Sequence, residues 1–412
     1  MERIHGKYLF SRDVNWDKMI FLSGPRQIGK TTFVKNHLEK IKQADFYYNW
    51  DDPFVLKRYR QNPHFLKAPI ASQRTKPLVA FDEIHKHRNW KNILKGLYDI
   101  HHHEAQFIVT GSARLDYFRQ SGDSLVGRYF SFRMFPLGLS EATGQMDPII
   151  HDDSYFSQDS SDEFVARLRA MKVPENKEAF DALAVFGGFP EPFLKSSQRF
   201  SNKWRHDYKS LLLYEDLRDM TRITDIKGVE QLTLLLPERV ASPLSVNSLR
   251  EDLAATHKTV LNWIESLKKI YLVFSIRPWS QNIARAIKKE KKVYFFDWTH
   301  IPDKGKKFEN MLAVSLARLV CHWNELGIAD FELCYVRNAQ KKEVDFLIVK
   351  DRNPYVLIEA KSAMTTPSKS GVYFQKMLNI PFFQIVADYH DVEVFPNQTF
   401  IIGAPLFFGL IG

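Results

Sequence analysis

The chain has 412 residues, of which 44% are apolar and 26% charged, a composition typical of a globular protein with two or three domains. No run of about 18 apolar residues occurs, so we expect no transmembrane helix and no membrane partner. The first residues lack the apolar core of a signal peptide, and the cysteines, Cys321 and Cys334, are too few for a disulfide framework or a zinc site. We therefore expect a cytoplasmic protein. Lysine and arginine number 58 against 48 acidic residues, a net charge of +10 that favours a polyanionic partner such as nucleic acid.

The stretch KMIFLSGPRQIGKTTFVKNHLEKI combines a short apolar run, a glycine loop and a helical pattern. Its centre reads G-x-x-x-x-G-K-T, the phosphate-binding loop, in the strand–loop–helix context that this loop requires. Glycine lets backbone N–H groups approach phosphate oxygens, and the N-terminus of the following helix favours negative charge. We expect Lys30 to reach the β- and γ-phosphates of ATP and Thr31 to hold Mg²⁺. The candidate nucleotide-binding residues here are Gly24, Pro25, Arg26, Gln27, Ile28, Gly29, Lys30, Thr31 and Thr32.

Two later apolar runs end in polar residues. KPLVAFDEIHK is apolar on both faces, as in a covered parallel strand, and ends in Asp82 and Glu83. An aspartate that orients Mg²⁺ and a glutamate that activates water would lie there, although an ordinary strand can also end in two solvated acids. AQFIVTGSARL ends in Thr110 and Ser112, which could contact the γ-phosphate or the attacking water. Between the two motifs, ADFYYNWDDP predicts a further strand and a turn.

In this order of motifs, continued by LVGRYFSFRMFPLGLSE, residues 1 to about 140 resemble the AAA-type P-loop ATPases of bacteria and archaea. The resemblance implies Asp82 as the Mg²⁺ residue, Glu83 as the catalytic base and a sensor near Thr110 to Ser112. Such enzymes usually complete the site with an arginine from a neighbouring subunit, so a homo-oligomer is a further expectation. Arg114 and Arg128 are both candidates for that arginine.

The middle of the chain predicts a linker and helical region over 142–225 and a winged helix-turn-helix over 226–298. In SPLSVNSLREDLAATHKTVLNWIESLKKIYLVFSI, Ser248 and Glu251 form a capping-box pattern that opens a short helix. A second helix would bury apolar residues at helical spacing, and an apolar strand follows. Its exposed side chains suit contacts with DNA, although such modules can also be plain packing or protein-contact elements. The buried set is Val260, Ile264, Leu267 and Ile270, and the exposed set is Lys258, Thr259, Asn262 and Lys268. The run KKEKK at 288–292 predicts a basic hairpin tip or a solvated turn.

Near the C-terminus, EVDFLIV and PYVLIEAK are strand-like runs around the polar turn KDRN. If this hairpin is symmetric about Arg352, Asp345 lies opposite Glu359 on the neighbouring strand, and Lys361 shares a face with Glu359. Facing carboxylates destabilise a strand pair, so a metal ion between them would explain the pattern. Together these residues form the D…E-x-K constellation, and the segment resembles restriction-endonuclease-like nucleases.

The nuclease resemblance implies that Asp345 and Glu359 bind a divalent cation and that Lys361 orients water and stabilises charge in phosphodiester cleavage. Upstream, Glu309 shares a helical stripe with apolar residues in KKFENMLAVSLARLV. It is either a further metal ligand, as the resemblance implies, or a cap near the start of its helix.

The sequence thus predicts an α/β protein made of a P-loop AAA-type ATPase core over 1–141, the linker and winged-helix regions, and a restriction-endonuclease-like domain over 299–412. The expected function is ATP binding and hydrolysis with Mg²⁺, coupled to nucleic acid binding, DNA being favoured, or to metal-dependent cleavage. The alternative is a nucleotide-gated regulatory or scaffold protein whose nuclease-like domain does not cleave.

Overall fold

The structure, a computed structural model, describes all residues except 11–16, 112–114, 116–124, 145–155, 157–160, 171–172, 222, 281–289 and 364–365. The chain divides into two compact units. The N-terminal unit comprises residues 2–135 and 269–271, and the C-terminal unit comprises Met1, 136–268 and 272–412. The expected regions after residue 141 therefore all lie in the C-terminal unit, apart from the three residues 269–271.

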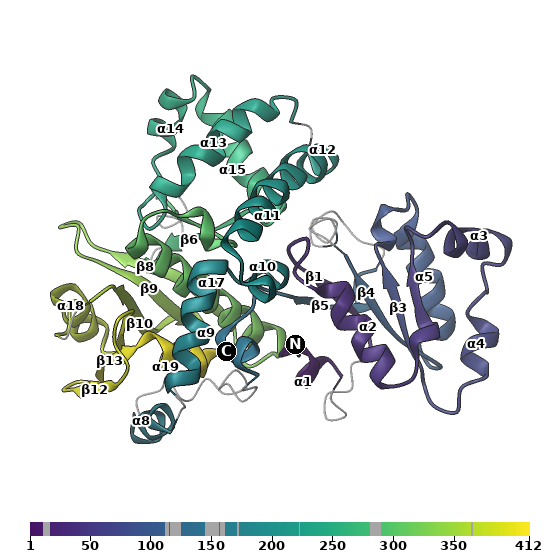
Figure 1. Cartoon of the computed structure of the whole chain (residues 1–412), viewed down its shortest axis with the longest axis horizontal. Helices are drawn as coiled ribbons and strands as arrows, with labels where there is room; N and C mark the ends of the chain where they lie inside the picture. Colours follow the sequence, from purple (N-terminus) through teal and green to yellow (C-terminus); the bar gives the residue numbers. More distant parts are fainter. Residues whose placement is uncertain are drawn as a thin grey trace. The chain divides into compact units, whose positions relative to one another are not determined.

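The N-terminal unit is built on a five-stranded sheet in the order β2-β3-β4-β1-β5, with every neighbouring pair parallel. Strands β1 and β3 are buried along their whole length, and β4 is buried from its second residue, as the apolar runs in the sequence predict. Helices α2 and α5 flank the strands (Figure 1). The strands are β1 Met19–Ser23, β2 Tyr47–Asn49, β3 Leu78–Asp82, β4 Gln106–Thr110 and β5 Tyr129–Arg133. The helices are α1 His5–Leu9, α2 Lys30–Lys40, α3 Pro53–Gln61, α4 Lys67–Ala71 and α5 Trp90–His101, with short 3₁₀ turns η1 Ala44–Phe46 and η2 Ile84–Lys86.

The parallel arrangement brings the carboxyl ends of β1, β3 and β4 to one edge of this sheet. The glycine loop follows β1 there, Asp82 is the last residue of β3, and Thr110 is the last residue of β4. Asp82 and Thr110 are register partners on neighbouring strands. Residues that are far apart in the sequence therefore meet at the position where open α/β sheets hold their ligands.

The C-terminal unit combines helices with an eight-stranded mixed sheet in the order β12-β13-β11-β10-β9-β8-β6-β7. The strands are β6 Val273–Pro278, β7 Lys292–Phe295, β8 Phe331–Arg337, β9 Glu343–Lys350, β10 Asn353–Lys361, β11 Phe382–Val386, β12 Val392–Phe395 and β13 Thr399–Gly403. β8, β9 and β10 are consecutive antiparallel strands, whereas β10 pairs with β11 in parallel across helix α18. β6 and β7 come from the region 226–298, and the other strands of this sheet come from the region 299–412, so the two regions form one sheet.

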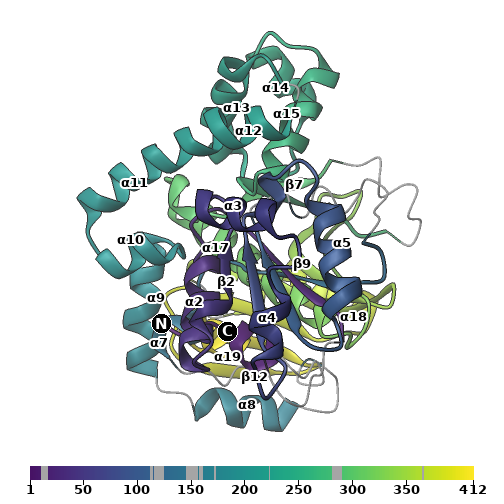
Figure 2. The same ribbon diagram turned by 90° about the vertical axis from the view of Figure 1, so that its right-hand side faces the viewer.

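The helices of the C-terminal unit include one cluster, α13 to α15, that Figures 1 and 2 both show as a separate group. Among the described residues, no helix of the chain has the length and apolar character needed to cross a membrane. The helices are α7 Leu139–Thr143, α8 Ser161–Arg169, α9 Val173–Phe186, α10 Pro190–Lys195, α11 Gln198–Leu211, the π-helical turn η5 Leu212–Asp216, α12 Leu217–Met220, α13 Ile226–Arg239, α14 Val246–Asp252, α15 His257–Lys269, the 3₁₀ turn η6 Trp298–His300, α17 Lys304–Glu325, α18 Lys369–Leu378 and α19 Ala404–Ile411.

The predicted cap of the first helix in the helix-turn-helix pair is wrong by one turn. Ser245 is the N-cap of α14, and its hydroxyl accepts a hydrogen bond from the backbone N–H of Ser248. Ser248 itself lies inside the helix and accepts a hydrogen bond from Arg239. The second helix, α15, buries Val260, Ile264 and Leu267 as the sequence predicts, and Ile270 is buried directly after the helix ends at Lys269. Only Ser248 has a glutamate three residues on, but Ser245 is also an N-cap residue type, so the capping-box pattern selected the wrong serine.

Candidate functional site

The glycine loop between β1 and α2 has the backbone geometry that its sequence requires. Gly24 has φ +141° and Gly29 has φ +97°, a region that residues with a side chain rarely adopt. A Cβ atom on Gly24 would lie 2.4 Å from the carbonyl oxygen of Met134. Glycine is therefore needed at residue 24 for both conformation and space.

Lys30 begins α2, and its side chain is buried against the loop that precedes it. Its ammonium group donates hydrogen bonds to the carbonyl oxygens of Gly24, at 2.9 Å, and Pro25, at 2.7 Å. These carbonyls are neutral acceptors, and a phosphate oxygen would be a stronger, charged one. Lys30 is therefore placed to move to a phosphate group bound in the loop.

Asp82 is the centre of a buried hydrogen-bond network at the carboxyl edge of the sheet. Its side chain accepts hydrogen bonds from the hydroxyls of Thr31, at 2.7 Å, Tyr47, at 2.6 Å, and Thr110. Burial, together with the hydrogen bond to Asp82, raises the pKa of Tyr47 well above its ordinary value, so its hydroxyl stays protonated and donating. Thr31 and Asp82 are oxygen ligands of the kind that Mg²⁺ prefers, and their placement beside the loop fits an ATP–Mg²⁺ complex.

Glu83, the residue after Asp82, has a strained backbone with φ 57°. Its carboxylate lies 3.2 Å from the ammonium group of Lys86 and 3.6 Å from Nε2 of His85. Lys86 also pairs with Asp51, and although burial opposes its charge, the two carboxylates raise its pKa. Glu83 is thus held beside the Asp82 network by a lysine that is shared with a second acid.

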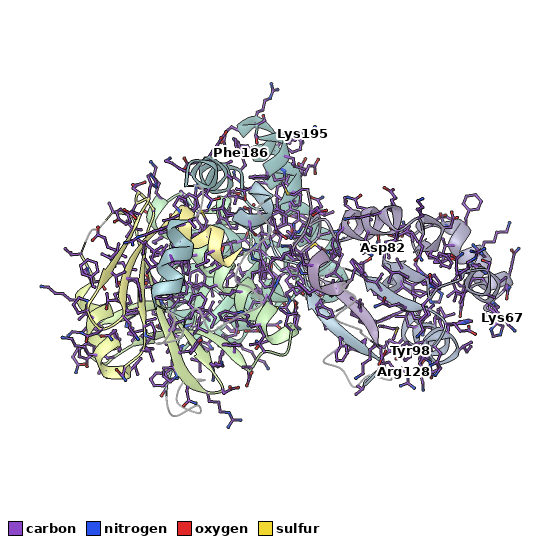
Figure 3. The ribbon with its side chains drawn as sticks, turned by 90° about the horizontal axis from the view of Figure 1, so that it is seen from below. Lys67, Asp82, Tyr98, Arg128, Phe186 and Lys195 are labelled. Atoms are coloured by element: carbon purple, nitrogen blue, oxygen red, sulfur yellow. The ribbon has the colours of Figure 1, made fainter. Side chains whose placement is uncertain are left out.

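The residues expected to complete the nucleotide site are only partly described. Ser112 and Arg114 lie outside the described residues. Arg128 precedes β5, so it lies at the amino edge of the parallel sheet, opposite to the glycine loop. There it pairs with Asp99 at 2.7 Å, and Figure 3 shows it beside Tyr98 and apart from Asp82. Arg128 therefore does not reach the nucleotide site of its own chain.

In the C-terminal unit, β9 and β10 bring Asp345 opposite Glu359 as predicted, but the hairpin is not symmetric about Arg352. Asn353 pairs with Lys350 beside the turn, and a register shift between Pro354 and Val356 moves the later pairs by one residue. Ile358 pairs with Phe346, which places Glu359 opposite Asp345 at the next position. The turn residues Asp351 and Arg352 both have positive φ, as in a two-residue type I′ hairpin turn. Oδ2 of Asp345 accepts a hydrogen bond from the backbone N–H of Ala360 on the facing strand at 3.0 Å.

Glu359 and Lys361 form a close pair on the face of β10 that they share. The Lys361 ammonium lies 2.7 Å from the Glu359 carboxylate, which also accepts a hydrogen bond from the hydroxyl of Ser368. Burial raises the pKa of Glu359, and the hydrogen bonds from Lys361 and Ser368 oppose that rise. The structure thus brings the predicted residues Asp345, Glu359 and Lys361 together, with Lys361 neutralising Glu359.

Glu309 lies in the second turn of α17 and does not cap that helix, because Asp303 is the N-cap residue. Its carboxylate instead accepts a hydrogen bond from the hydroxyl of Tyr294 at 2.8 Å. Burial, followed by the charge of Asp345, raises the pKa of Glu309 despite its cationic neighbour Lys292. The structure therefore excludes the alternative in which Glu309 caps its helix.

Lys292, at the start of β7, lies among the carboxylates of the C-terminal unit. Its side chain has no exposed surface, and its ammonium lies 2.8 Å from Glu343, 3.2 Å from Glu309 and 3.4 Å from Asp345. We call Glu309, Glu343 and Asp345 the carboxylate cluster. Burial opposes the charge of Lys292, but the three carboxylates outweigh it and raise the pKa of Lys292 above its ordinary value.

The expectation that KKEKK is a solvated turn or a hairpin tip is wrong for its last residue. Lys292 is fully buried, whereas Glu290 and Lys291 are exposed and residues 288–289 lie outside the described residues. Lys292 and Glu343 are functional candidates that sequence reasoning missed. The only local signal was that Lys292 opens the apolar run KVYFFD, where alternation can turn a polar residue inward.

The surface of α15 carries part of the predicted contact set. Lys258 and Asn262 are exposed and Thr259 is half-buried. Lys268 lies 3.0 Å from the Glu265 carboxylate one turn away, so its charge is already paired. Of these two lysines, the one whose charge is exposed and not paired with any described residue is Lys258, near the N-terminal end of α15.

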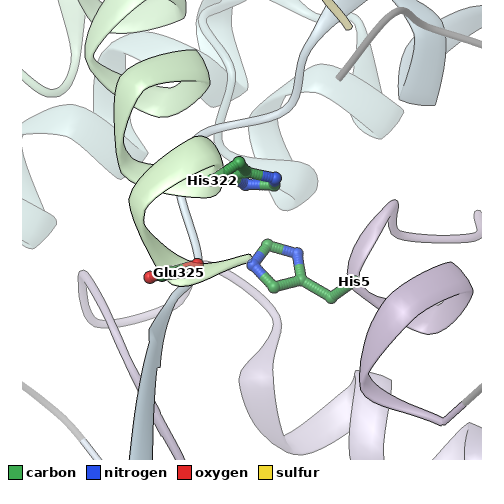
Figure 4. A group of neighbouring side chains, drawn as sticks. All are labelled: His5, His322 and Glu325. Atoms are coloured by element: carbon green, nitrogen blue, oxygen red, sulfur yellow. The ribbon is translucent and has the colours of Figure 1, made fainter. Parts of the chain in front are cut away.

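Figure 4 shows a group of three potential metal ligands, His5, His322 and Glu325. His322 and Glu325 are one turn apart on α17 of the C-terminal unit, whereas His5 belongs to α1 of the N-terminal unit. Two ligands from one helix are too few for a metal centre, so we assign no metal site to α17.

Comparison with known families identifies two segments of the chain. Residues 17–143 match the family model described as an AAA domain. Residues 177–299 match a family described as a domain of unknown function, DUF8612. The AAA match contains the glycine loop, Asp82, Glu83 and Thr110, which is the site built above.

The chain is also similar to full-length proteins. An uncharacterized protein of Methanocaldococcus jannaschii is 24% identical over 83% of this chain and 74% of its own length. An uncharacterized protein of Mycobacterium tuberculosis is 22% identical over 94% of this chain and 80% of its own.

Among solved structures, the Aeropyrum pernix ORC1 protein in complex with DNA is 16% identical over 77% of this chain and 91% of that chain, with a TM-score of 0.28. The replication initiator DnaA bound to AMPPCP and single-stranded DNA is 14% identical over 62% of this chain and 83% of that chain, with a TM-score of 0.27. The family match supports a P-loop AAA domain over residues 17–143, in a mixed α/β protein with a further sheet-containing region.

Proposed function

We propose that the N-terminal unit binds and hydrolyses ATP with Mg²⁺, and that the chain couples this reaction to nucleic acid binding. The observation that carries the proposal is the hydrogen bond between Thr31, at the end of the glycine loop, and Asp82, at the end of β3. It joins the phosphate-binding element to the acidic pair Asp82 and Glu83 at one edge of the sheet. This is the arrangement that phosphoryl transfer to water requires.

Each residue of the site has a role in that reaction. Thr31 and Asp82 would hold Mg²⁺, which supplies positive charge to the phosphate oxygens as the reaction proceeds. Lys30 would leave the carbonyls of Gly24 and Pro25 and donate to the phosphates. Glu83 would accept a proton from the attacking water, after its carboxylate is released from Lys86.

Nucleic acid is the partner that the charge of the chain favours. The net charge is +10, and α15 exposes Lys258 and Asn262 near its N-terminal end. A helix that presents its first turns in this way can contact phosphates and bases, as in helix-turn-helix modules. Because helix-turn-helix modules contact DNA in this way, we favour DNA over RNA as the partner. An arginine from a neighbouring subunit, Arg128 or Arg114, remains a proposal that would require a homo-oligomer.

For the C-terminal unit, the element order α17, β8, β9, β10, α18, β11 and the convergence of Asp345, Glu359 and Lys361 support a nuclease-like domain. Two roles follow from that resemblance, metal-dependent cleavage and binding without cleavage. The placement of Lys292 inside the carboxylate cluster favours binding without cleavage. The second candidate function is therefore a nucleotide-gated regulatory or scaffold protein.

The ATPase proposal is tested by measuring steady-state ATP hydrolysis and binding of a fluorescent ATP analogue in the same variants. Lys30→Ala should abolish hydrolysis, and Glu83→Gln should bind ATP without hydrolysing it, because only proton transfer is lost. Lys40→Ala, an exposed lysine on the same helix α2, is the matched control and should behave as wild type. Normal turnover in Lys30→Ala would overturn the assignment.

A further inference from the structure

The sequence does not decide which cation neutralises the facing carboxylates of the C-terminal unit. Asp345 and Glu359 face one another across the β9–β10 hairpin, and Glu309 lies nearby on α17. Facing carboxylates coexist only if a cation or a proton separates them. The nuclease resemblance implies a divalent metal ion as that cation.

The side chain of Lys292 already supplies a cation to these carboxylates. Its ammonium lies between 2.8 and 3.4 Å from one oxygen each of Glu343, Glu309 and Asp345, and is completely buried. A divalent cation would need the same oxygens at about 2.0–2.6 Å. It could not approach them with a buried ammonium in place, because the two positive charges would repel at close range. The residues present therefore do not fit a divalent metal ion while Lys292 is in the cluster.

The fold holds Lys292 in this position through the backbone of β7. The side-chain amide of Asn310, the residue after Glu309, donates to the carbonyl of Phe295 at 2.7 Å and accepts from its N–H at 2.8 Å. This buried clamp joins the strand that carries Lys292 to the helix that carries Glu309. The Lys292 ammonium also lies over the ring of Tyr335, at 5.5 Å from the ring centroid. Lys292 is thus fixed by the core and is not a mobile surface lysine.

The charges around Lys292 are close to balance without a metal ion. Among the described residues, the four carboxylates of Glu309, Glu343, Asp345 and Glu359 have three cationic partners, Lys292, Arg337 and Lys361. Arg337 lies 3.2 Å from Glu343, and Lys361 lies 2.7 Å from Glu359. The remaining negative charge is shared over hydrogen bonds from the Tyr294 hydroxyl and the Ala360 N–H. A divalent ion added to this set would change one excess negative charge into one excess positive charge.

We propose that Lys292 is the resident cation of the carboxylate cluster, so that the C-terminal unit engages nucleic acid without a divalent metal ion and does not hydrolyse phosphodiester bonds. The inference rests on the second candidate function, a nucleotide-gated regulatory or scaffold protein, and explains why its nuclease-like domain does not cleave. It does not depend on the nucleotide site, whose residues lie in the other unit.

The proposal is tested by titrating the full chain with Mn²⁺ in the absence of nucleotide and measuring the bound Mn²⁺ by electron paramagnetic resonance. The wild type and Asp345→Asn should bind the same amount of Mn²⁺, because Asp345 ligates none. Lys292→Met, which keeps the volume of the side chain, should gain one Mn²⁺ per chain, and the double variant Lys292→Met/Asp345→Asn should lose it. Lys291→Met, the exposed neighbouring lysine, is the matched control and should gain none.

Two results would overturn the proposal. One is Mn²⁺ binding by the wild type that Asp345→Asn removes, a comparison that needs no Lys292 variant to fold. The other is a folded Lys292→Met protein that gains no Mn²⁺ site. Plasmid and single-stranded DNA incubated with Mg²⁺ or Mn²⁺ should also remain intact with the wild type, and cleavage that Asp345→Asn abolishes would contradict the proposal. ATP hydrolysis measured on the same samples should be unchanged throughout, so failure here is distinguishable from failure of the ATPase assignment.

Discussion

Asp82 is the residue whose substitution should reveal how the nucleotide site is held together before ATP binds. Asp82 is 3% exposed, and its carboxylate accepts hydrogen bonds from three hydroxyl groups, on Thr31, Tyr47 and Thr110. Asp82→Ala would leave the buried hydroxyl of Thr110 and the half-buried hydroxyls of Thr31 and Tyr47 without their acceptor. At about 1–1.5 kcal/mol for each, the loss in unfolding free energy is about 3–5 kcal/mol. For a unit of this size that corresponds to a fall in melting temperature of roughly 10–20 °C.

Two further variants separate the contributions to this loss. Asp82→Asn keeps the shape of the side chain, and hydroxyl groups can turn to accept from its amide, so the loss should be only about 1–2 kcal/mol. Thr110→Val removes one donor and should cost about 1 kcal/mol. Asp45→Asn, an exposed acid of the same unit, is the control and should have no effect.

The measurement is differential scanning calorimetry of the full chain without nucleotide, which follows the transition of each unit. The Asp82 variants should shift the transition of the N-terminal unit and leave that of the C-terminal unit in place. A transition for Asp82→Ala within about 2 °C of the wild type would refute the reasoning, because one buried and two half-buried hydroxyls cannot lose their acceptor at so small a cost.

The remaining predictions concern pH and nucleic acid. Burial, followed by the charge of Lys40, lowers the pKa of His37 to about 4, so the folded N-terminal unit favours the neutral imidazole. The unfolded chain takes up this proton near its ordinary pKa of 6.5, so stability should fall as the pH falls from about 6.5 to about 4, and melting temperatures of His37→Gln should decline less over that window. DNA affinity should weaken steeply with salt, and in fluorescence anisotropy Lys258→Ala should reduce it more than Lys268→Ala, because Glu265 already neutralises Lys268. Equal affinity of both variants and the wild type would exclude α15 as the contact surface.

The parts of both sites that could be predicted from the sequence depend on local patterns. The glycine loop is a contiguous motif, and its backbone conformation follows from residues 24–31 alone. The facing of Asp345 and Glu359 is predicted from a hairpin symmetric about Arg352, whereas the structure reaches it through a two-residue turn and a one-residue register shift between Pro354 and Val356. In both cases the residues that set the geometry are within about twenty positions of one another, but only the loop follows from spacing alone, because spacing does not reveal the bulge in β10.

The parts that could not be predicted depend on pairing between distant segments. Tyr47 and Thr110 meet at Asp82 only because β2, β3 and β4 are neighbours in the sheet. Lys292 looks like a member of a charged turn, and only the attachment of β7 to α17 turns it into the carboxylate cluster. No periodicity in the sequence encodes the meeting at Asp82, and the alternation in KVYFFD indicates at most that Lys292 faces inward, without identifying its partners.

The central claim, that the glycine loop and Asp82 form a working ATP site, is tested most directly by a structure of Glu83→Gln with ATP and Mg²⁺. We predict that the triphosphate lies against the loop Gly24–Thr31, that Mg²⁺ lies beside Thr31, and that the Lys30 ammonium has left the carbonyls of Gly24 and Pro25 for the phosphates. A structure in which Lys30 keeps both carbonyl contacts and the nucleotide binds elsewhere, or not at all, would contradict the account.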